Sequence, residues 1–538
     1  MEVGTKEKLS FHIDSIMTIY SLVFPPLNSV VKLFSLTICF FVLFSCNYEK
    51  NQTNKSEEKF NVLFIIADDL NCAIGALGDT MAQTPNIDRL ASNGFLFENA
   101  HNQYPLCGPS RASLMTGMYS EQTQITGNNI FLRNSVPDAI TIGQRFRQNG
   151  YQSVRIGKIF HYDNPSAIGT SGNDDIHSWD QTINPYGRDK LDEYLINTLS
   201  PRRFGGTLSW LSCDGEDTEQ TDGIGTTNAI EQLDQFAKNK TNFFLAVGFF
   251  RPHTPFVAPH KYFNLFDQNT MIIPKTSDEY LTTLPKPAAK SIRAKKNQLN
   301  LNDSLAKEIK EAYYATVSFV DAQVGRILDH LDRTGLAQNT IVVFTSDHGY
   351  HLGEHGHWQK QTLFDNATKV PLIFTYPGIQ KKGVKCEAPV ELIDVYPTIM
   401  DLVNINVPKH VVGKSLKPII DNEIESVRSS ALTRWKNGYS IKTKRYRFTE
   451  WKFDGKLGHE LYDHKYDKEE LNNLALSENY KPIFDSLQRM LRKRIEKAQL
   501  IPEDIGRQLK DVTPIPKAPN ITYGDLYNED GKLISRKK

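Results

Sequence analysis

From residue 60 onward, short apolar and β-branched runs alternate with amphipathic stretches. This alternation favours an α/β fold in which a central mixed, mainly parallel sheet is flanked by helices. Residues 61–66 (NVLFII) and 340–344 (TIVVF) are continuous apolar runs, which suit buried central strands. Residues 304–334 carry apolar side chains at helical spacing. This spacing predicts a long packing helix that leads into the second strand.

Acidic residues follow both apolar runs. Asp68 and Asp69 come after the first run, and Asp347 and His348 after the second. If the two strands are parallel neighbours, all four groups emerge at the carboxyl edge of the sheet. Open α/β folds bind their ligands at this edge. The pattern therefore predicts a functional site there.

The pattern changes after about residue 425. Short polar and aromatic runs follow, and residues 481–498 then show helical spacing. We predict a large catalytic domain at 60–425 and a smaller α+β subdomain with an antiparallel sheet at 426–538.

Two polar insertions interrupt the large domain. Residues 214–223 hold five acids in ten positions, but their spacing is not that of an EF-hand, so a solvated turn before a helix is predicted. Residues 286–296 are basic and could meet an anionic polymer, although a solvated helix face is the commoner meaning of such a run.

The N-terminus has the pattern of an export signal. Residues 33–45 form an apolar run that is shorter than the roughly 20 residues of a spanning helix. Lys32 precedes this run and Cys46 follows it, an order that resembles a bacterial lipoprotein signal. The resemblance implies a signal region with a lipobox at 1–46, lipidation of Cys46, and a polar tether at 47–59. The expected location is the periplasm or the cell surface. An uncleaved anchor helix is the alternative, and it too would export the protein.

Composition narrows the class of protein. With 538 residues, 39% hydrophobic and 23% charged, the chain can bury a large core. The 63 Lys and Arg nearly balance the 62 Asp and Glu, so no general basic field exists and no nucleic-acid partner is expected. Six cysteines without CxxC spacing exclude a disulfide-built scaffold and a structural zinc site of that type.

The most informative segment is CGPSR at residues 107–111, followed by Thr116 and Gly117. Pro109 and the helix-favouring residues after it predict a helix N-terminus, whose free N–H groups and positive dipole end would favour an anion near residue 107. The aspartates after the two strands offer carboxylate oxygens, which suit a hard divalent cation such as calcium.

The CxPSR and TG pattern resembles the maturation signature of type I sulfatases, whose fold is alkaline-phosphatase-like. In that family a formylglycine-generating enzyme oxidises the cysteine to Cα-formylglycine. Further similar segments are GKIFH, GFFRPHTPF, TSDHGYHLGEHGHWQK and ELYD, at 157–161, 248–256, 345–360 and 460–463. The resemblance covers about residues 60–480, and its spacing is closest to the iduronate-2-sulfatase type. His348 stands where sulfatases often have Asn, and a neutral imidazole can also bind a metal.

The resemblance implies a site. The expected calcium ligands are Asp68, Asp69, Asp347, His348 and the modified Cys107. The expected catalytic residues are Cys107, Arg111, Lys158, His161, His253 and Lys360. In this scheme a hydroxyl of the hydrated aldehyde attacks the sulfate ester, and His253 and Lys360 assist the leaving oxygen. His161 takes the proton that lets sulfate depart, and Lys158 neutralises sulfate oxygens. We interpret His351, His355 and His357 as loop residues and not as a zinc cluster.

The implied function is hydrolysis of the sulfate ester of a sulfated sugar. A uronate 2-O-sulfate or a related residue in oligosaccharides from ulvan or glycosaminoglycans is the expected substrate. The expected partners are this substrate and the maturing enzyme, with membrane contact only through the lipid anchor. Two alternatives stay open, a non-catalytic glycan-binding lipoprotein and a metal-dependent phosphoester hydrolase of the same superfamily. The phosphoester hydrolases use a Ser or Thr nucleophile, so the CxPSR segment disfavours that alternative.

Overall fold

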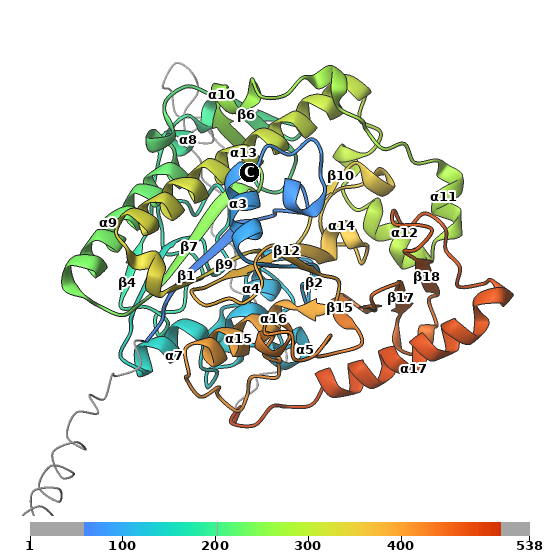
Figure 1. Ribbon diagram of the computed structural model, residues 1–538. Coiled ribbons are helices and arrows are strands. Elements are labelled where there is room, and N and C mark those ends of the chain that lie inside the picture. Colours follow the sequence, from blue (N-terminus) through green and yellow to red (C-terminus); the bar gives the residue numbers. More distant parts are fainter. Residues whose placement is uncertain (1–58, 202, 507–538) are drawn as a thin grey trace, which may run out of the picture. The chain divides into compact units, whose positions relative to one another are not determined.

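A mixed nine-stranded sheet forms the centre of the fold in the computed structural model, which describes residues 59–201 and 203–506 (Figure 1). The strand order is β13-β2-β12-β9-β1-β7-β3-β4, and β14 also pairs with β2. The strands are β1 (Asn61–Asp68), β2 (Phe95–His101), β3 (Gln152–Gly157), β4 (Gln181–Ile183), β7 (Phe243–Pro252), β9 (Thr340–Ser346), β12 (Lys369–Thr375), β13 (Val384–Cys386) and β14 (Val390–Glu391). β1 is parallel to β7 and β9, and only β12 runs antiparallel to its neighbours. The predicted mixed, mainly parallel sheet is confirmed.

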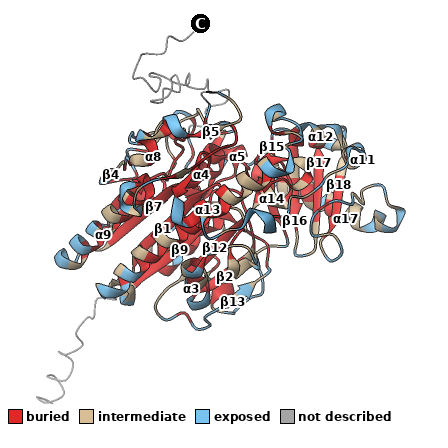
Figure 2. Ribbon diagram, turned by 90° about the horizontal axis from the view of Figure 1, so that it is seen from above, coloured by how far each residue is buried: buried red, intermediate tan, exposed pale blue. Residues whose placement is uncertain are grey.

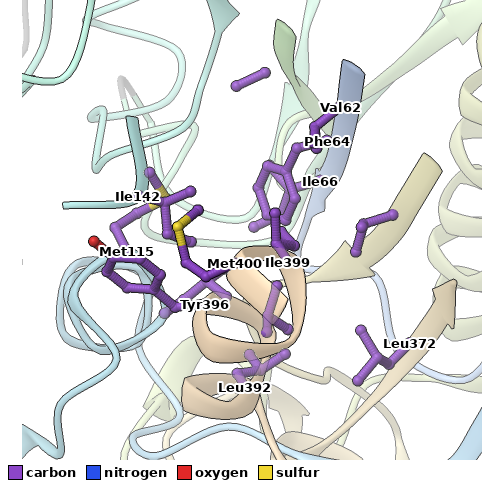
Figure 3. Packing of buried hydrophobic residues seen from close by; sticks show 14 of the residues in the cluster. Val62, Phe64, Ile66, Met115, Ile142, Leu372, Leu392, Tyr396, Ile399 and Met400 are labelled. Atoms are coloured by element: carbon purple, nitrogen blue, oxygen red, sulfur yellow. The ribbon is translucent and has the colours of Figure 1, made fainter. Parts of the chain in front are cut away.

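Strand β1 explains why both faces of the sheet are covered. All eight of its residues are buried. Val62, Phe64 and Ile66 pack on one side against α4 (Cys107–Thr116), α7 (Ile142–Gln148) and α15 (Val395–Leu402), as Figure 3 shows. The alternate residues Leu63, Ile65 and Ala67 join a second core with α3 (Pro85–Asn93), α9 (Thr221–Asn239) and α13 (Asp303–Arg333). A continuous apolar strand is thus required, because no position of β1 faces water.

Helix α13 matches the helix predicted over 304–334 almost residue for residue. The side chain of Asn302 caps its first turn by accepting the backbone N–H of Leu305 at 2.9 Å. Its apolar stripe lies on the sheet, while outer helix faces such as that of α9 carry intermediate and exposed residues (Figure 2). Each fully buried Val or Ile in such a stripe contributes roughly 1.5–3 kcal/mol.

Shorter elements connect this framework. A three-stranded sheet holds β5 (Asn197–Thr198), β6 (Ser209–Cys213) and β8 (Phe256–Pro259), and a hairpin holds β10 (His351–Leu352) and β11 (Trp358–Gln359). The short helices are α5 (Ser120–Thr123), α6 (Leu132–Ser135), α8 (Arg188–Leu191), α10 (His260–Phe263), α11 (Asp278–Thr283), α12 (Lys286–Ile292), α14 (Asp365–Thr368) and α16 (Lys417–Ile420).

An antiparallel sheet follows the large one in sequence, as predicted. It consists of β15 (Ala431–Trp435), β16 (Gly438–Lys442), β17 (Tyr446–Trp451) and β18 (His459–Asp463). Helix α17 (Lys481–Ala498) packs on it through Leu487, Leu491 and Ile495 (Figure 1). The proposed domain boundaries at 60–425 and 426–538 stay a prediction.

The two polar insertions differ from their predictions in one detail. The acidic segment does turn into a helix, α9, but its Asp222 is buried and accepts the backbone N–H groups of Phe250 and Arg251, both at 2.9 Å. It is therefore a structural brace and not a solvated acid. The basic segment forms α12, which buries Ala288 and Ile292 and leaves Lys290 exposed.

The predicted signal region 1–46, its Cys46 and most of the tether lie outside the described residues. Within 59–201 and 203–506, the helices are either too short or too polar to cross a membrane.

Candidate active site

Four elements bring the predicted site residues to one edge of the large sheet. Asp68 ends β1, Asp347 follows β9, His253 follows β7, and Cys107 is the first residue of α4. The parallel register sets Ala67 beside Ser346, so the carboxyl ends of β1 and β9 coincide. The prediction that the acidic groups share this edge is confirmed.

Arg111 ties these elements together from the second turn of α4. Its guanidinium is fully buried and donates through Nε to Asp347 Oδ2 at 2.8 Å and through Nη2 to Asp68 Oδ1 at 2.9 Å. Nη1 donates to the backbone oxygens of Lys158 and Ile159 at 2.7 and 3.0 Å. Such a fork holds two carboxylates and a loop in fixed positions.

Lys158 neutralises the other oxygen of Asp68. Its ammonium forms an ion pair with Asp68 Oδ2, and both side chains are fully buried. Although burial alone would raise the pKa of the Asp68 carboxyl, the charges of Lys158, His253 and Arg111 hold it well below its ordinary value. The backbone at Lys158 requires glycine opposite it, because a Cβ on Gly248 would lie 1.9 Å from the Lys158 oxygen.

Asp69 adopts a left-handed backbone conformation with φ of 65°. Lys360 Nζ donates to both of its carboxylate oxygens, at 2.7 and 2.6 Å, and the Tyr313 hydroxyl donates to its backbone oxygen at 2.9 Å. His253 Nε2 lies 3.7 Å from Asp69 Oδ2. Burial raises the pKa of Asp69, although Lys360 opposes this shift. This strained residue is thus held by groups from three separate segments.

Cys107 lies among these groups. Its Sγ is 3.2 Å from His348 Nε2 and 3.9 Å from Asp69 Oδ1. Only 1% of the residue is exposed, and burial raises the pKa of the thiol well above its ordinary value. An unmodified Cys107 is therefore a protonated thiol and a weak nucleophile.

His348 is oriented by its own chain. Its Nδ1 lies 2.9 Å from the oxygen of Gly349, which can only accept a hydrogen bond, so Nδ1 is the donor and, in a neutral ring, Nε2 has the free electron pair. That pair faces Cys107 Sγ, and Asp69 Oδ1 lies 3.4 Å away. The orientation is that of an imidazole able to bind a metal.

The donor atoms meet the spacing of a metal site. One ligand atom from each of Asp68, Asp69, Cys107 and His253 lies within 4.8 Å of the others, and the same holds for Cys107, Asp347 and His348. Three of the six residues in these two groups offer carboxylate oxygens, which suit a hard cation. The buried aspartates are balanced by the cations of Arg111, Lys158 and Lys360.

His161 lies slightly apart from the cluster. Its Nε2 is 3.3 Å from Asp163 Oδ1, and its buried Nδ1 has no hydrogen-bond partner among the described residues. Burial lowers the pKa of His161 to about 4, and the Lys158 charge adds to this shift. The imidazole is therefore neutral near pH 7.

Sequence reasoning missed one brace and misjudged one segment. Tyr313 was predicted only to pack, yet its hydroxyl also accepts the backbone N–H of Asn71 at 2.9 Å. The interpretation of His351, His355 and His357 as loop residues is only partly right, because all three are buried and His351 lies in β10. His357 Nε2 lies 2.9 Å from the oxygen of Lys360. Among the described residues, the three do not form a metal-binding group.

A second group of possible metal ligands lies next to the antiparallel sheet. Asp365, His464 and Glu470 have ligand atoms within 4.8 Å of one another. Arg447 donates to both carboxylates, through Nε to Glu470 Oε1 at 2.5 Å and through Nη2 to Asp365 Oδ1. We call these four residues the Arg447 cluster.

Comparison with known proteins identifies relatives over most of the chain. Residues 60–405 match the Sulfatase family, and residues 353–497 match the C-terminal region of N-sulphoglucosamine sulphohydrolase. A sulfatase of Formosa agariphila is 35% identical over 83% of this chain and 89% of its own length. Human iduronate 2-sulfatase is 32% identical over 75% of this chain and 86% of its own length. Among solved structures, a 2-O GAG sulfatase superposes with a TM-score of 0.64 at 25% identity, covering 82% of this chain and 93% of that one.

These matches confirm the resemblance that the CxPSR segment indicated, and they confirm the alkaline-phosphatase-like fold class. The match to the Sulfatase family includes every residue of the cluster built around Cys107. The chain belongs to the sulfatase family and is a sulfuric ester hydrolase.

Proposed function

We propose that this enzyme hydrolyses the sulfate ester of a sulfated sugar in oligosaccharides released from polysaccharides. One observation carries the proposal: Cys107 begins helix α4 with its Sγ 3.2 Å from His348 Nε2, inside a buried cluster of carboxylates and cations. In a sulfatase, this is the position from which a nucleophile reaches sulfur while fixed cations meet the charge on the sulfate oxygens.

Conversion of Cys107 to Cα-formylglycine is part of the proposal. This group would supply a hydrated aldehyde whose hydroxyl attacks sulfur, which a buried thiol does not. The side chain at 107 lies at a helix N-terminus, where free N–H groups and the helix dipole favour an anion.

Calcium is the proposed metal, and Asp68, Asp69, Asp347, His348 and residue 107 would hold it. The residues fit because the carboxylate oxygens suit a hard cation and because His348 presents an unprotonated Nε2 to the cluster. When bound, the metal would draw charge from a sulfate oxygen.

The protein's own side chains would neutralise charge on the sulfate and transfer protons. Lys158 and Arg111 are buried cations beside the expected sulfate position. Lys360 carries protons that it can donate toward a leaving oxygen, and its Nζ lies over the Tyr350 ring at 5.9 Å. The neutral His161, with its unpartnered Nδ1, is suited to accept a proton. His253 donates its Nδ1 proton to the Thr254 oxygen at 2.6 Å, and its Nε2 lies 3.7 Å from Asp69 Oδ2.

A uronate 2-O-sulfate or a related residue is the proposed substrate. The names of the human relative and of the superposed 2-O GAG sulfatase support this class, as does the spacing of the motif segments. Fragments of glycosaminoglycans or of ulvan are the proposed sources of this substrate. The non-catalytic alternative is disfavoured, because each side chain that it would lack is present in the cluster.

Two measurements test the reaction. Protein produced with a formylglycine-generating enzyme is digested, and the peptide with Cys107 is examined by mass spectrometry. Sulfate release is then measured on an aryl sulfate and on sulfated uronate and rhamnose oligosaccharides. We expect loss of the thiol mass and turnover that Cys107→Ala abolishes. Cys213→Ala, which changes another buried cysteine, is the matched control and should keep activity. A persistent thiol together with turnover would contradict the formylglycine proposal.

The metal is tested by removal. Chelation should abolish sulfate release, and calcium should restore it better than magnesium, which prefers a more regular shell with bound water. Full activity in the chelated enzyme would contradict the metal proposal.

We further propose that the protein is exported and lipid-anchored through Cys46. The order of Lys32, the apolar run and Cys46 supports this address. Cys46→Ala should release the protein from the membrane fraction without loss of sulfatase activity, and unchanged membrane association would contradict the anchor.

A further inference from the structure

A basic groove lies at the opposite end of helix α4 from Cys107. It is a cavity of about 620 Å³, and five of its ten lining residues are cations, whereas none is an acid: Lys414, Arg428, Lys493, Arg494 and Lys497. The whole chain has a formal charge of only +1, so this concentration of positive charge is local. We call it the basic groove.

Helix α4 separates the groove from the catalytic cluster. The backbone oxygen of Gly117, which caps the C-terminus of α4, accepts the N–H groups of Val412 and Gly413 at 2.9 and 3.3 Å. Val412 lines the groove, and Tyr119 lines it next to the same helix end. A helix of ten residues is about 15 Å long. The groove is therefore a separate site and not a part of the catalytic centre.

The base of the groove is rigid. Buried Glu391 accepts Arg494 Nη2 at 2.6 Å and the Tyr119 hydroxyl at 2.7 Å, and it also pairs with Arg428. Only 5% of the Arg428 side chain is exposed, and its Nε has no hydrogen-bond partner among the described residues. The two guanidiniums are thus held in place before any ligand arrives, which reduces the entropy cost of binding.

Two lysines add uncompensated charge at the rim. Lys493 and Lys497 lie one turn apart on α17, are exposed, and have no acidic partner among the described residues. Val412, Met490 and Leu500 add apolar surface to the lining of the same groove. A lining that combines cations with apolar surface suits a sugar ring bearing anionic groups.

A second cavity of about 580 Å³ shares Arg428 and Ser429 with the groove. Its lining adds the cations of Lys381, Lys385 and Lys444 and one acid, Glu425, and Lys444 pairs with Glu387 at 2.7 Å. Two adjacent cavities in which cations outnumber acids favour an extended polyanion over a single small anion. Their concave form also favours a flexible chain over the flat surface of a membrane.

We propose that the basic groove is a second, non-catalytic binding site for the sulfated chain of the polysaccharide substrate. Its ligand class rests on the proposed function, but the presence of the site does not. The groove holds one stretch of the polymer while a sulfate elsewhere on the chain enters the catalytic cluster, so it acts on polymers and long oligosaccharides and not on small sulfate esters.

The test compares two double variants of the full chain with the same change in charge. Lys493→Glu with Lys497→Glu alters the groove. Lys238→Glu with Arg489→Glu alters exposed positions on α9 and α17 that do not line it. Binding of a fluorescently labelled heparan sulfate dodecasaccharide is measured by anisotropy in the Cys107→Ala background, so that the ligand is not consumed.

We expect the groove variant to bind about tenfold more weakly, which corresponds to about 1.4 kcal/mol, with the control unchanged. The desulfated dodecasaccharide should bind weakly to all forms. With Cys107 intact, the groove variant should raise KM for the polymer and leave kcat/KM for an aryl sulfate unchanged. The binding measurement does not depend on turnover. It would therefore still test the groove if the sulfatase proposal failed.

Three results would overturn the proposal: equal affinity of the two double variants, equal binding of sulfated and desulfated ligand, or a groove-dependent affinity seen only for phosphatidylserine vesicles. Thermal unfolding checks that the variants fold. If the glutamates lower stability, Lys493→Gln with Lys497→Gln provides the same comparison with a smaller change in charge.

Discussion

The catalytic cluster and the Arg447 cluster are both groups of charged side chains with the spacing of a metal site, the first buried and the second partly buried. They differ in what occupies the centre. In the Arg447 cluster the guanidinium lies between Asp365 and Glu470 and also donates to Ser440 Oγ at 3.1 Å and Thr368 Oγ1 at 2.9 Å. Glu470 additionally accepts the backbone N–H of Asp365 at 2.8 Å. The carboxylates are thereby satisfied by the protein itself.

In the catalytic cluster the cations bind from the periphery. Arg111, Lys158 and Lys360 each pair with an aspartate, while Cys107 Sγ and His348 Nε2 face each other in the interior. Both of these interior atoms can act as electron-pair donors to a ligand or a metal ion. Similar composition therefore serves two purposes: a cluster with a central guanidinium fixes structure, and a cluster with peripheral cations leaves donor atoms for a ligand.

The largest expected effect is a loss of sulfate release when the catalytic cluster, but not the Arg447 cluster, loses an aspartate charge. Asp69→Asn removes a charge that pairs with Lys360 and that we assign to the metal, so sulfate release should fall by about 10³-fold, equivalent to about 4 kcal/mol of barrier. Asp365→Asn is the matched control in the Arg447 cluster and should keep kcat at a temperature where it is folded. Equal loss of kcat in both folded variants would remove the functional distinction.

The next effect is a loss of stability, without loss of kcat, when the Arg447 cluster loses its cation. Arg447→Met leaves the buried carboxylate of Glu470 and the half-buried carboxylate of Asp365 without their cation, which should cost about 3–5 kcal/mol in the free energy of unfolding. Urea unfolding measures this loss, and kcat of the folded fraction should stay near that of the parent enzyme. Adding Asp365→Asn and Glu470→Gln should recover part of the stability, because no charge is then left unpaired. A normal unfolding midpoint for Arg447→Met would show that the cluster does not fix the structure.

An effect of pH on the free energy of unfolding is expected next to the Arg447 cluster. Burial lowers the pKa of the neighbouring Lys442 to about 8, although Asp365 opposes the shift. An unfolded lysine keeps its proton up to about pH 10.4, so between these values the unfolded state binds more protons and stability rises with pH. The rise is at most about 3 kcal/mol, because each tenfold difference in proton affinity between the two states corresponds to about 1.4 kcal/mol. Lys442→Met should flatten this rise in urea unfolding between about pH 7.5 and 9.5, and an unchanged slope would contradict the assignment.

Periodic hydrophobicity made the framework predictable. Strands β1 and β9 and helices α13 and α17 begin within one residue of their predicted starts, because each is specified by a long run of its own apolar residues. The meeting of Asp68 with Asp347 followed from parallel strands that end together. The sequence was sufficient to predict those features that depend on the residues of a single helix or strand.

Contacts between distant elements were not predictable in the same way. Asp222 stands in an acidic, solvent-like segment, and only the fold brings it under the N–H groups of Phe250 and Arg251. Gln359 and Gln361 have φ of 81° and 77° on either side of Lys360, but neither is a glycine that would signal such a turn. Tertiary contacts impose these conformations, and a single sequence does not record them.

The smallest expected effect concerns a hydrogen bond that supports the catalytic cluster. Tyr313→Phe removes the hydroxyl that donates to the Asp69 oxygen and accepts from Asn71, but keeps the ring stacked on Tyr350 at 5.4 Å. Loss of these hydrogen bonds should cost about 1 kcal/mol of stability. Because Asp69 has a left-handed backbone that this hydroxyl helps to hold, kcat should fall more than KM rises. Tyr314→Phe, next on α13, removes a hydrogen bond to Asp79 and is the control that should lose similar stability and no kcat. Equal kcat for the two variants would mean that Tyr313 stabilises the fold without positioning Asp69.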